Sequence, residues 1–275
     1  MRKVAFRVNA LDAPDAPRKI QIAPVPYLGG VAIVVGVLAT TYGSIFFKSS
    51  KDLGLASTVL LPAALMAAMG LADDLRSLQP WPRLLAQTCV GLVVAAVLIA
   101  TDTLGTPTHI FLIDALLTTT WIVGVCNSIN FFDNLDGGAA GTVAVISIFT
   151  FLIAIDRGQE IIAALAVVTA GATLGFLIWN RSPAKIYMGD AGALFLGIIV
   201  AVMTIRLKPD LHPLWKSLTV PLFLLAVPLL DTTVAVFSRL QRNISPFTGG
   251  RDHLSHRLMR KGIDRKVAAI TLWSL

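Results

Sequence analysis

Five clusters of acidic, amide and basic side chains interrupt an otherwise apolar chain, and each lies at one end of an apolar stretch. Carboxylates can hold Mg²⁺ or accept protons, and amide oxygens can also bind Mg²⁺, whereas arginine and histidine bind phosphate oxygens. If the clusters meet in space, they could act on a phosphate-bearing substrate. In chain order they are Arg18-Lys19 with Pro24, Pro26 and Gly29-Gly30; Asp73-Asp74; Asn127 to Asp136; Lys185 to Asp190; and Arg251 to Arg257.

The adjacent acids Asp73 and Asp74 follow Gly70 at the end of an apolar stretch. Two carboxylates this close repel each other unless a cation or a base neutralises them. We therefore interpret the pair as a metal-binding or proton-accepting site. A solvated loop in which the acids only flank Arg76 explains the pair equally well.

The densest polar group runs from Asn127 to Asp136. Steps of three residues, from Asn127 through Asn130 and Asp133 to Asp136, place these side chains near one stripe if the helix persists. Amides and carboxylates in such a row could hydrogen-bond a base or a sugar, and the glycines that follow let backbone approach a ligand. A polar turn between two helices is the weaker alternative.

The fourth cluster leads into the next apolar stretch and has two interpretations. Asp190 could be a helix N-cap, or it could hold Mg²⁺ against phosphate oxygens gathered at a helix N-terminus. Tyr187 could stack on a nucleobase or anchor the chain at a membrane interface. The sequence leaves both alternatives open.

The fifth cluster contains His253 and His256, whose three-residue spacing can place both on one helical face. Arginine and histidine together suit a phosphate or diphosphate. Zinc is a weaker choice because no cysteine or third histidine is nearby, and a basic loop on anionic lipid is the simpler alternative. The Arg18-Lys19 pair is likewise compatible with phosphate contact or with membrane anchoring, and Asp231 is a further acid inside an apolar run.

The elements that must position these clusters are the apolar stretches themselves. The chain is 55% hydrophobic and only 14% charged, with a mean hydropathy of +0.75, whereas soluble domains carry about 25% charge. This composition predicts an all-α, polytopic transmembrane helical bundle, one domain over residues 1–275. Several apolar runs are shorter than the roughly 20 residues that cross a bilayer, which favours broken or re-entrant pieces. The expected spans are 31–47, 58–72, 84–101, 110–130, 138–155, 161–179, 191–206 and 218–238, with a ninth beginning near 266.

The distribution of basic residues predicts the orientation. If the N-terminus is cytoplasmic, 17 of the 23 lysines and arginines fall on the cytoplasmic side, as the positive-inside bias requires. All five clusters then share that side, and the net charge of +7 reflects orientation rather than nucleic-acid binding. Cys89 and Cys126 lack metal-ligand spacing and are interpreted as packing residues.

The clusters together carry a family resemblance. In order and spacing, PYLGG, GLADDLRSL, NSINFFDNLDGGAAG, PAKIYMGDAGALFLG and DHLSHRL resemble the polyprenyl-phosphate N-acetylhexosamine-1-phosphate transferases of glycosyltransferase family 4. The paired prolines and PAKIYMGD look more like the GlcNAc-1-phosphate branch than the phospho-MurNAc-pentapeptide branch. Compared with the family pattern, the chain is expected to lack the first helix and part of the last.

The resemblance also implies residue roles. Asp73 and Asp74 match paired acids that deprotonate the lipid phosphate or help hold metal. Asp190, with Asn130, matches the Mg²⁺ site, for which Mn²⁺ is an alternative. The implied catalytic set also includes His253 and His256, which with Arg257 handle the diphosphate; the implied nucleotide-sugar pocket consists of Asn127, Asn130, Asp133, Asp136, Lys185 and Tyr187, the last stacking on uracil. Ser255 stands where many relatives have a further histidine.

The implied reaction transfers N-acetylhexosamine 1-phosphate, expected to be GlcNAc 1-phosphate, from a UDP-sugar to polyprenyl (undecaprenyl) phosphate. UMP is released, and the product starts a cell-envelope polysaccharide such as lipopolysaccharide. The implied location is the inner (plasma) membrane, with the bilayer as a partner, no nucleic acid, and a homodimer left open. The alternatives are a phospho-MurNAc-pentapeptide transferase and, from another class, an ion-coupled transporter, although transporters usually place such residues near the bilayer midplane.

Overall fold

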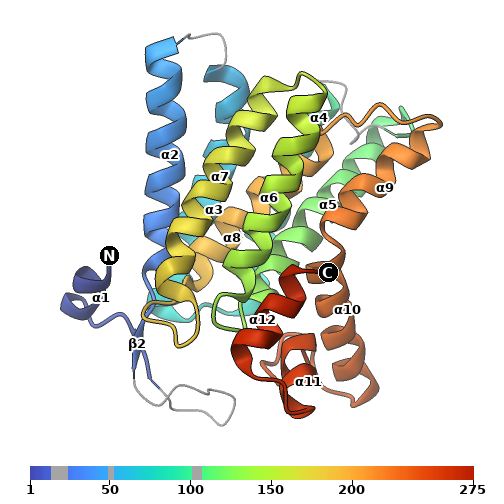
Figure 1. Cartoon of the computed structure of the whole chain (residues 1–275). Coiled ribbons are helices and arrows are strands. Elements are labelled where there is room, and N and C mark those ends of the chain that lie inside the picture. Colours follow the sequence, from blue (N-terminus) through green and yellow to red (C-terminus); the bar gives the residue numbers. More distant parts are fainter. Residues whose placement is uncertain (14–23, 49–52, 101–106) are drawn as a thin grey trace.

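The chain folds as a bundle of α-helices with one short β-hairpin beside it (Figure 1). The computed structural model describes residues 1–13, 24–48, 53–100 and 107–275, so Arg18-Lys19 lies outside the described residues. The hairpin pairs β1 (Leu11–Asp12) with β2 (Val25–Pro26) in antiparallel register. The helices are α1 (Arg2–Arg7), α2 (Gly29–Lys48), α3 (Leu53–Arg76), α4 (Pro80–Ile99), α5 (Phe111–Phe132), α6 (Gly138–Asp156), α7 (Glu160–Asn180), α8 (Gly189–Arg206), α9 (Leu214–Leu224), α10 (Ala226–Gln241), α11 (Leu254–Arg260) and α12 (Arg265–Trp273).

Seven of these helices, α2 to α8, are long and apolar enough to cross a membrane. They match the first seven expected spans and confirm the all-α, multi-pass bundle. The expectation of broken pieces among the short runs is wrong for 58–72 and 191–206, where α3 and α8 are continuous helices of 24 and 18 residues. Each helix extends past its apolar run into the adjacent polar cluster, which supplies the missing length.

The expected span 218–238 is the one that breaks. Its two parts, α9 and α10, meet at an angle of 73°. Pro228 has no N–H to bond the carbonyl of Leu224, and Pro221 lies inside α9, so a regular helix cannot continue through this stretch. The bend directs α10 away from the line of α9 and towards the end of α5.

Helix α8 is the centre of the bundle. Of its span, 89% is buried, and it packs mainly against α3 and α5. Close packing with α5 depends on Gly197, where an added Cβ would lie 2.7 Å from the Cα of Cys126. Cys126 is a buried packing residue as expected, whereas Cys89 is exposed and the packing interpretation is wrong there, because its face of α4 lies on the bundle surface.

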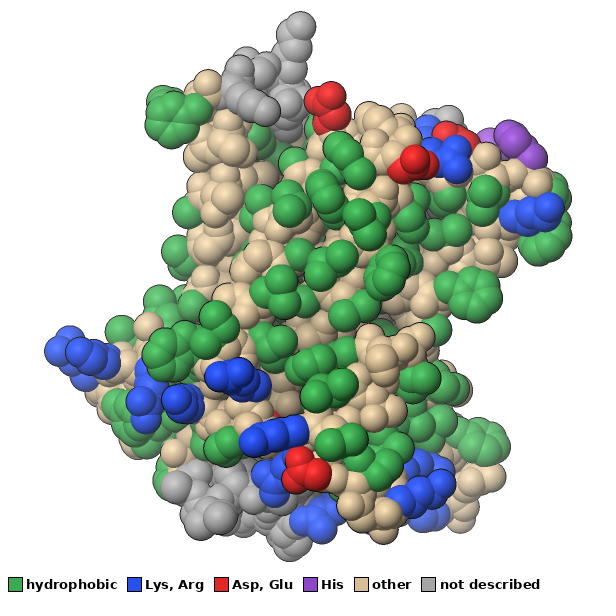
Figure 2. All heavy atoms as spheres, in the orientation of Figure 1, with side chains coloured by type: hydrophobic (Ala, Val, Ile, Leu, Met, Phe, Trp, Pro, Cys, Tyr) green, Lys and Arg blue, Asp and Glu red, His purple; other side chains and the backbone are tan. Residues whose placement is uncertain are grey.

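One end of the bundle collects the polar clusters. Helices α2, α4, α6 and α8 begin at this end, and α3, α5, α7 and α10 finish at it, together with the β-hairpin and α11 (lower end of Figure 1). Hydrophobic side chains cover the middle of the face in Figure 2, while Lys and Arg side chains gather mostly towards this same end. The bundle therefore places residues far apart in sequence at one polar surface.

Candidate active site

A cavity of about 760 Å³ opens at the polar end and brings the sequence clusters together. It is bordered by the ends of α3, α5 and α7, the starts of α4 and α8, and the loop before α11. The predicted site residues that line it are Asp73, Asp74, Asn130, Asp133, Asp136, Tyr187, Asp190, His253 and His256. The expected meeting of the described clusters is thus observed in the fold.

Arg83, in the first turn of α4, joins three of these groups. Its guanidinium forms an ion pair and hydrogen bond with Asp73, lies 3.1 Å from a carboxylate oxygen of Asp190, and donates to the amide oxygen of Asn130 at 3.4 Å. Asn130 in turn donates to the other oxygen of Asp190 at 2.8 Å. One guanidinium therefore offsets part of the repulsion between two acids from α3 and α8, and it also bonds an amide from α5.

Asp74 points the other way and holds the start of α8. Its two oxygens accept the backbone N–H groups of Asp190 and Ala191, at 2.8 and 3.1 Å. A Cβ at Gly70 would lie 2.4 Å from the backbone oxygen of Asp190, so α3 and α8 meet backbone to backbone. The two adjacent acids thus have different partners: Asp73 pairs with a side chain, and Asp74 caps a helix.

The segment before α2 packs against the same start of α8. Gly29 and Gly30 donate to the carbonyls of Tyr187 and Met188, at 3.0 and 2.8 Å, and Tyr187 donates back to Pro26. A Cβ at Gly30 would lie 2.2 Å from the nitrogen of Gly192, so only glycine permits this contact. The described part of the first cluster therefore positions the Asp190 turn.

The helical stripe expected from Asn127 to Asp136 does not persist. Helix α5 ends at Phe132, and Asp133 leaves the helical conformation. The following turn is fixed by buried Asn180, which accepts the N–H of Gly137 and donates to the carbonyl of Ile186. Asp133 and Asp136 still reach the cavity, but from a turn rather than from a helix face.

Burial changes the protonation of two groups in this turn region. Burial raises the pKa of Asp133 to about 7, and the nearby Asp190, Asp74 and Asp136 carboxylates add to the shift. Burial also raises the pKa of the Tyr187 phenol, followed by the effect of Asp136. Asp133 therefore exchanges a proton near neutral pH, while the Tyr187 phenol stays neutral.

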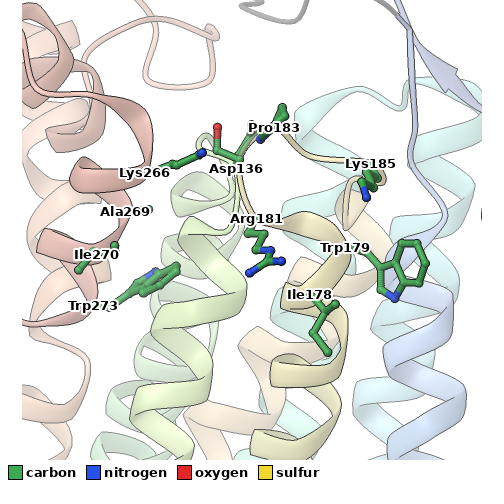
Figure 3. A pocket seen from close by; sticks show the side chains of 11 residues that line it. Asp136, Ile178, Trp179, Arg181, Pro183, Lys185, Lys266, Ala269, Ile270 and Trp273 are labelled. Carbon is green, nitrogen blue, oxygen red and sulfur yellow. The ribbon is translucent and has the colours of Figure 1, made fainter.

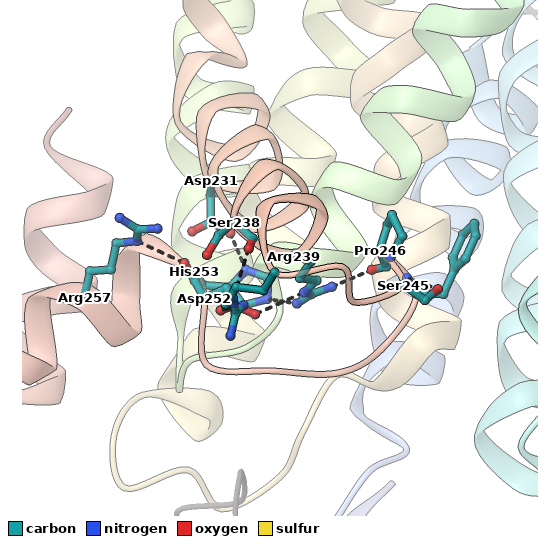
Figure 4. Close-up of polar contacts among 10 residues, drawn as sticks. Asp231, Ser238, Arg239, Ser245, Pro246, Asp252, His253 and Arg257 are labelled. Carbon is teal, nitrogen blue, oxygen red and sulfur yellow. Dashed lines mark hydrogen bonds and ion pairs between the residues drawn. The ribbon is translucent and has the colours of Figure 1, made fainter.

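A second polar network holds His253 (Figure 4). Asp231 in α10 is fully buried, and it accepts the N–H of Leu254 at 2.6 Å and bonds the Nδ1 of His253 at 2.7 Å. Arg239 lies 3.2 Å from His253 Nε2. A guanidinium can only donate, so Nε2 accepts and the proton is on Nδ1, facing Asp231.

Further ion pairs fix the loop that carries His253. Arg239 bonds Asp252 at 3.1 Å and the carbonyl of Pro246 at 2.6 Å, and Arg242 pairs with the other oxygen of Asp252. Although burial alone raises the pKa of Asp252, these two guanidinium groups hold it below its ordinary value. The carboxylate stays ionised and ties the loop to the end of α10.

His256 follows one turn later and behaves differently. Burial lowers its pKa to about 4, with His253 and Arg251 contributing in the same direction. Ser255 donates to the amide oxygen of Asn134, linking this loop to the turn after α5. His256 is therefore a neutral imidazole at neutral pH, placed on the cavity wall.

Comparison with known proteins agrees with this arrangement. The family profile described as Glycosyl transferase family 4 matches residues 56–208. A Bacillus subtilis protein named probable undecaprenyl-phosphate N-acetylglucosaminyl 1-phosphate transferase is 31% identical, over 99% of this chain and 76% of its own length. The chain belongs to glycosyl transferase family 4.

Two further relatives are named for two different reactions. A decaprenyl-phosphate N-acetylglucosaminephosphotransferase of Mycolicibacterium smegmatis is 30% identical, over 99% of this chain and 75% of its own. A phospho-N-acetylmuramoyl-pentapeptide-transferase of Streptococcus uberis is 31% identical, over 76% of this chain and 66% of its own. Family membership makes this multi-pass membrane protein a transferase.

The acid group fits the Mg²⁺ expected for the family. In the described part of the chain, no group of three His, Cys, Asp or Glu side chains is arranged to hold a metal ion. However, oxygens of Asp73, Asp190 and Asn130 already converge on a positive charge, that of Arg83. Protein sites for Mg²⁺ often use only one or two carboxylates, with substrate phosphates completing the coordination. Asp190 with one neighbour is such a donor set.

Three predicted site residues do not line this cavity. Asn127 faces α4, where its amide bonds Gln87, and Arg257 folds back onto the carbonyl of Asp252 at 3.2 Å. Lys185 lies beside Trp179, with its amine 5.8 Å from the ring centroid. Their assigned substrate roles remain predictions, whereas their positions in this structure are outside the cavity wall.

Sequence reasoning missed three residues that shape the family 4 site. Arg83 and Arg239 entered only as charges that set the orientation, and Asn180 was not considered. A signal was available for Arg83, because it is a lone cation in the first turn of an apolar helix beside a pair of acids. No comparable pattern marks Asn180, whose partners lie in two different loops.

Proposed function

We propose that this chain transfers N-acetylhexosamine 1-phosphate from a UDP-sugar to a polyprenyl phosphate. A phosphate oxygen of the lipid attacks the β-phosphorus of the UDP-sugar, the bond from that phosphorus to the bridging oxygen breaks, and UMP leaves. The observation that carries the proposal is the convergence of Asp73, Asp190 and Asn130 on Arg83 at the wall of a 760 Å³ cavity. Family membership supports the reaction class.

The GlcNAc 1-phosphate branch is the better supported one. Relatives named for N-acetylglucosamine phosphate transfer align with 99% of this chain, whereas those named for the muramoyl-pentapeptide reaction align with 71–76%. We therefore take UDP-GlcNAc as the donor and undecaprenyl or a similar polyprenyl phosphate as the acceptor. The product would begin a cell-envelope polysaccharide.

The acid group would act on both substrates. Arg83 has five N–H donors, so it can bind a phosphate oxygen while it keeps a bond to Asp73 or Asp190. Asp190 and Asn130 would hold Mg²⁺, which would supply charge stabilisation for the diphosphate in the transition state. Asp73 would keep the acceptor phosphate fully ionised by accepting its proton.

The histidine network would hold the other side of the diphosphate. Both ring nitrogens of His253 are already bonded, so the donor to the diphosphate would be Arg239, whose guanidinium is fixed by Asp252 and His253 and costs no reorganisation when charge develops. Neutral His256 can donate one N–H to a phosphate oxygen without competing for a proton. Asp133, Asp136 and Tyr187, which line the same cavity, are the proposed contacts to uridine and the sugar.

The same proposal includes the orientation in the membrane. The polar end carries most of the lysines and arginines, so we place it in the cytoplasm, where UDP-sugars are made. The active site of the plasma-membrane protein then faces inward. Gathering of the acids at the ends of spans also disfavours ion-coupled transport, which uses residues near the bilayer midplane.

Purified protein in detergent micelles, given UDP-GlcNAc, undecaprenyl phosphate and Mg²⁺, tests the reaction directly. We expect a lipid-linked diphospho-sugar on thin-layer plates, equimolar UMP, and exchange of labelled UMP into UDP-GlcNAc. UDP-GalNAc and UDP-MurNAc-pentapeptide, run in parallel, measure donor choice. Folded, monodisperse protein that yields neither product nor exchange with any of these donors would contradict the proposal.

Replacing Mg²⁺ tests the metal. We expect activity to vanish with excess chelator and to return with Mg²⁺ or Mn²⁺, because both prefer oxygen ligands. Full activity in chelator would remove the metal from the proposed reaction while leaving the transfer itself in place.

A further inference from the structure

A second cavity, of about 530 Å³, opens at the same end of the bundle between the end of α7 and α12. It is separate from the active-site cavity, with which it shares only Asp136 among the described lining residues. Figure 3 shows Arg181 lying between the side chains of α12 and those of the last turn of α7. Apart from Asp136, no lining residue of this cavity takes part in the transfer as proposed above.

Positive charge exceeds negative charge around this cavity. Arg181, Lys185 and Lys266 line it, all three are exposed, and none forms an ion pair with another described residue. The single acid on its wall, Asp136, accepts the backbone N–H of Ala184 at 3.2 Å. The cavity is therefore suited to an anion, because one carboxylate offsets only one of the three cations.

The walls below these cations are apolar and open to the bilayer. Ile178 and Trp179 belong to the membrane span α7 and are 62% and 52% exposed, and Ile270 on α12 is 56% exposed. Tryptophan is enriched at the membrane interface, where one side of the ring meets lipid and the other meets water. The cavity thus joins a basic rim to a lipid-facing surface.

Trp273 lines the cavity and is held in place by specific contacts with α6. Its indole N–H donates to the carbonyl of Gly138 at 3.3 Å. The ring lies against Gly141, where an added Cβ would approach it to 2.1 Å. The small residues at the start of α6 are therefore needed to accommodate the ring, and this contact packs α12 against α6.

We propose that this cavity binds the headgroup of an anionic phospholipid, with phosphate between Arg181 and Lys266 and an acyl chain along Ile178 and Ile270. A free phosphate would pair with the cations but would have no apolar group to contact the apolar walls. A zwitterionic lipid would bring an ammonium group to a rim that carries three cations and one carboxylate. An anionic lipid uses both the charge and the walls.

The test measures lipid retention by the full chain. Protein purified in mild detergent is titrated with phosphatidylglycerol or phosphatidylcholine, and bound lipid is counted by native mass spectrometry. We expect selective retention of phosphatidylglycerol, weakened about thirtyfold in the double variant Arg181→Gln/Lys266→Gln, because each basic side chain near an anionic lipid contributes about fivefold in affinity. The swapped variant Arg181→Lys/Lys266→Arg should retain the lipid.

A matched control separates this site from general charge. Lys3→Gln/Arg7→Gln removes one lysine and one arginine from α1, both exposed and neither lining the cavity, and should leave retention unchanged. Equal losses in both double variants would reduce the effect to surface charge and overturn the proposal. So would equal retention of phosphatidylcholine, or displacement of the lipid by millimolar inorganic phosphate, which would assign the rim to a soluble anion.

Discussion

The two polar networks of the active-site cavity are built on opposite principles. Around Arg83, the two carboxylates of Asp73 and Asp190 share one guanidinium, so the group keeps an excess of negative charge. Around His253, the acids Asp231 and Asp252 are matched by Arg239 and Arg242, and the ring donates a hydrogen bond to Asp231. The first group still attracts a cation, whereas the second is complete and serves to position a side chain. Substitutions should therefore damage them in different ways.

Asp190→Asn should have the largest effect on the acid group. It removes the carboxylate shared by Arg83 and the proposed metal, so we expect transfer to fall by about 10³-fold, as when a preorganised charge-stabilising group is lost. Release of UMP from UDP-GlcNAc measures the effect, and an unchanged elution volume shows that the protein still folds. Activity close to wild type would withdraw Asp190 from the metal role.

Asp231→Asn should have the next largest effect, on the balanced network. The amide can still accept one hydrogen bond, but it no longer fixes the proton of His253 on Nδ1, and we expect kcat to fall by about 10²-fold with a changed pH profile and little change in KM. The neighbouring variant Thr233→Ala, on an exposed position of α10, is the control. A loss of thermal stability that accounts for all of the lost activity would make Asp231 structural only.

A double-mutant cycle should then distinguish shared from independent action in the acid group. Asp73→Asn and Arg83→Gln should each cost about tenfold, and the double variant should cost little more than either, because each change already breaks the same pair. Asp74→Asn serves as comparison: since Asp74 caps α8, it should lower the thermal midpoint and add to the other changes. Additive losses for Asp73 and Arg83 would show that their contact is unimportant for transfer.

The sequence predicted what depends on local pattern. Spans followed from runs of apolar residues, and the common polar end followed from the alternation of spans, because each crossing reverses the chain. Glycines at 30, 70 and 192 were visible in the motifs, but their purpose was not: they let α2, α3 and α8 touch through backbone. The residues of these motifs therefore serve helix packing as well as binding or catalysis.

Other features depend on tertiary contacts that no spacing encodes. The helical stripe from Asn127 ends early because Asn180 holds Gly137 in a turn with positive φ. Asn180 and Gly137 are 43 residues apart in the sequence. Arg83 looked like one more orienting charge, since its partners lie on three other segments of the chain. The broken span was visible as prolines, although its angle of 73° was not.

The smallest expected effect concerns Asp133, which lies between the two networks. Its folded pKa of about 7 is above the ordinary 3.8, so ionisation favours the unfolded chain, and stability contributed by the neutral form is lost as the pH rises towards 7. Asp133→Asn removes this loss. We expect its thermal midpoint to exceed that of the wild type by roughly 2–4 °C at pH 8, and by less at pH 5. If the thermal midpoints of variant and wild type differed equally at both pH values, Asp133 would ionise freely. The excess negative charge around Asp190 would then not extend to Asp133.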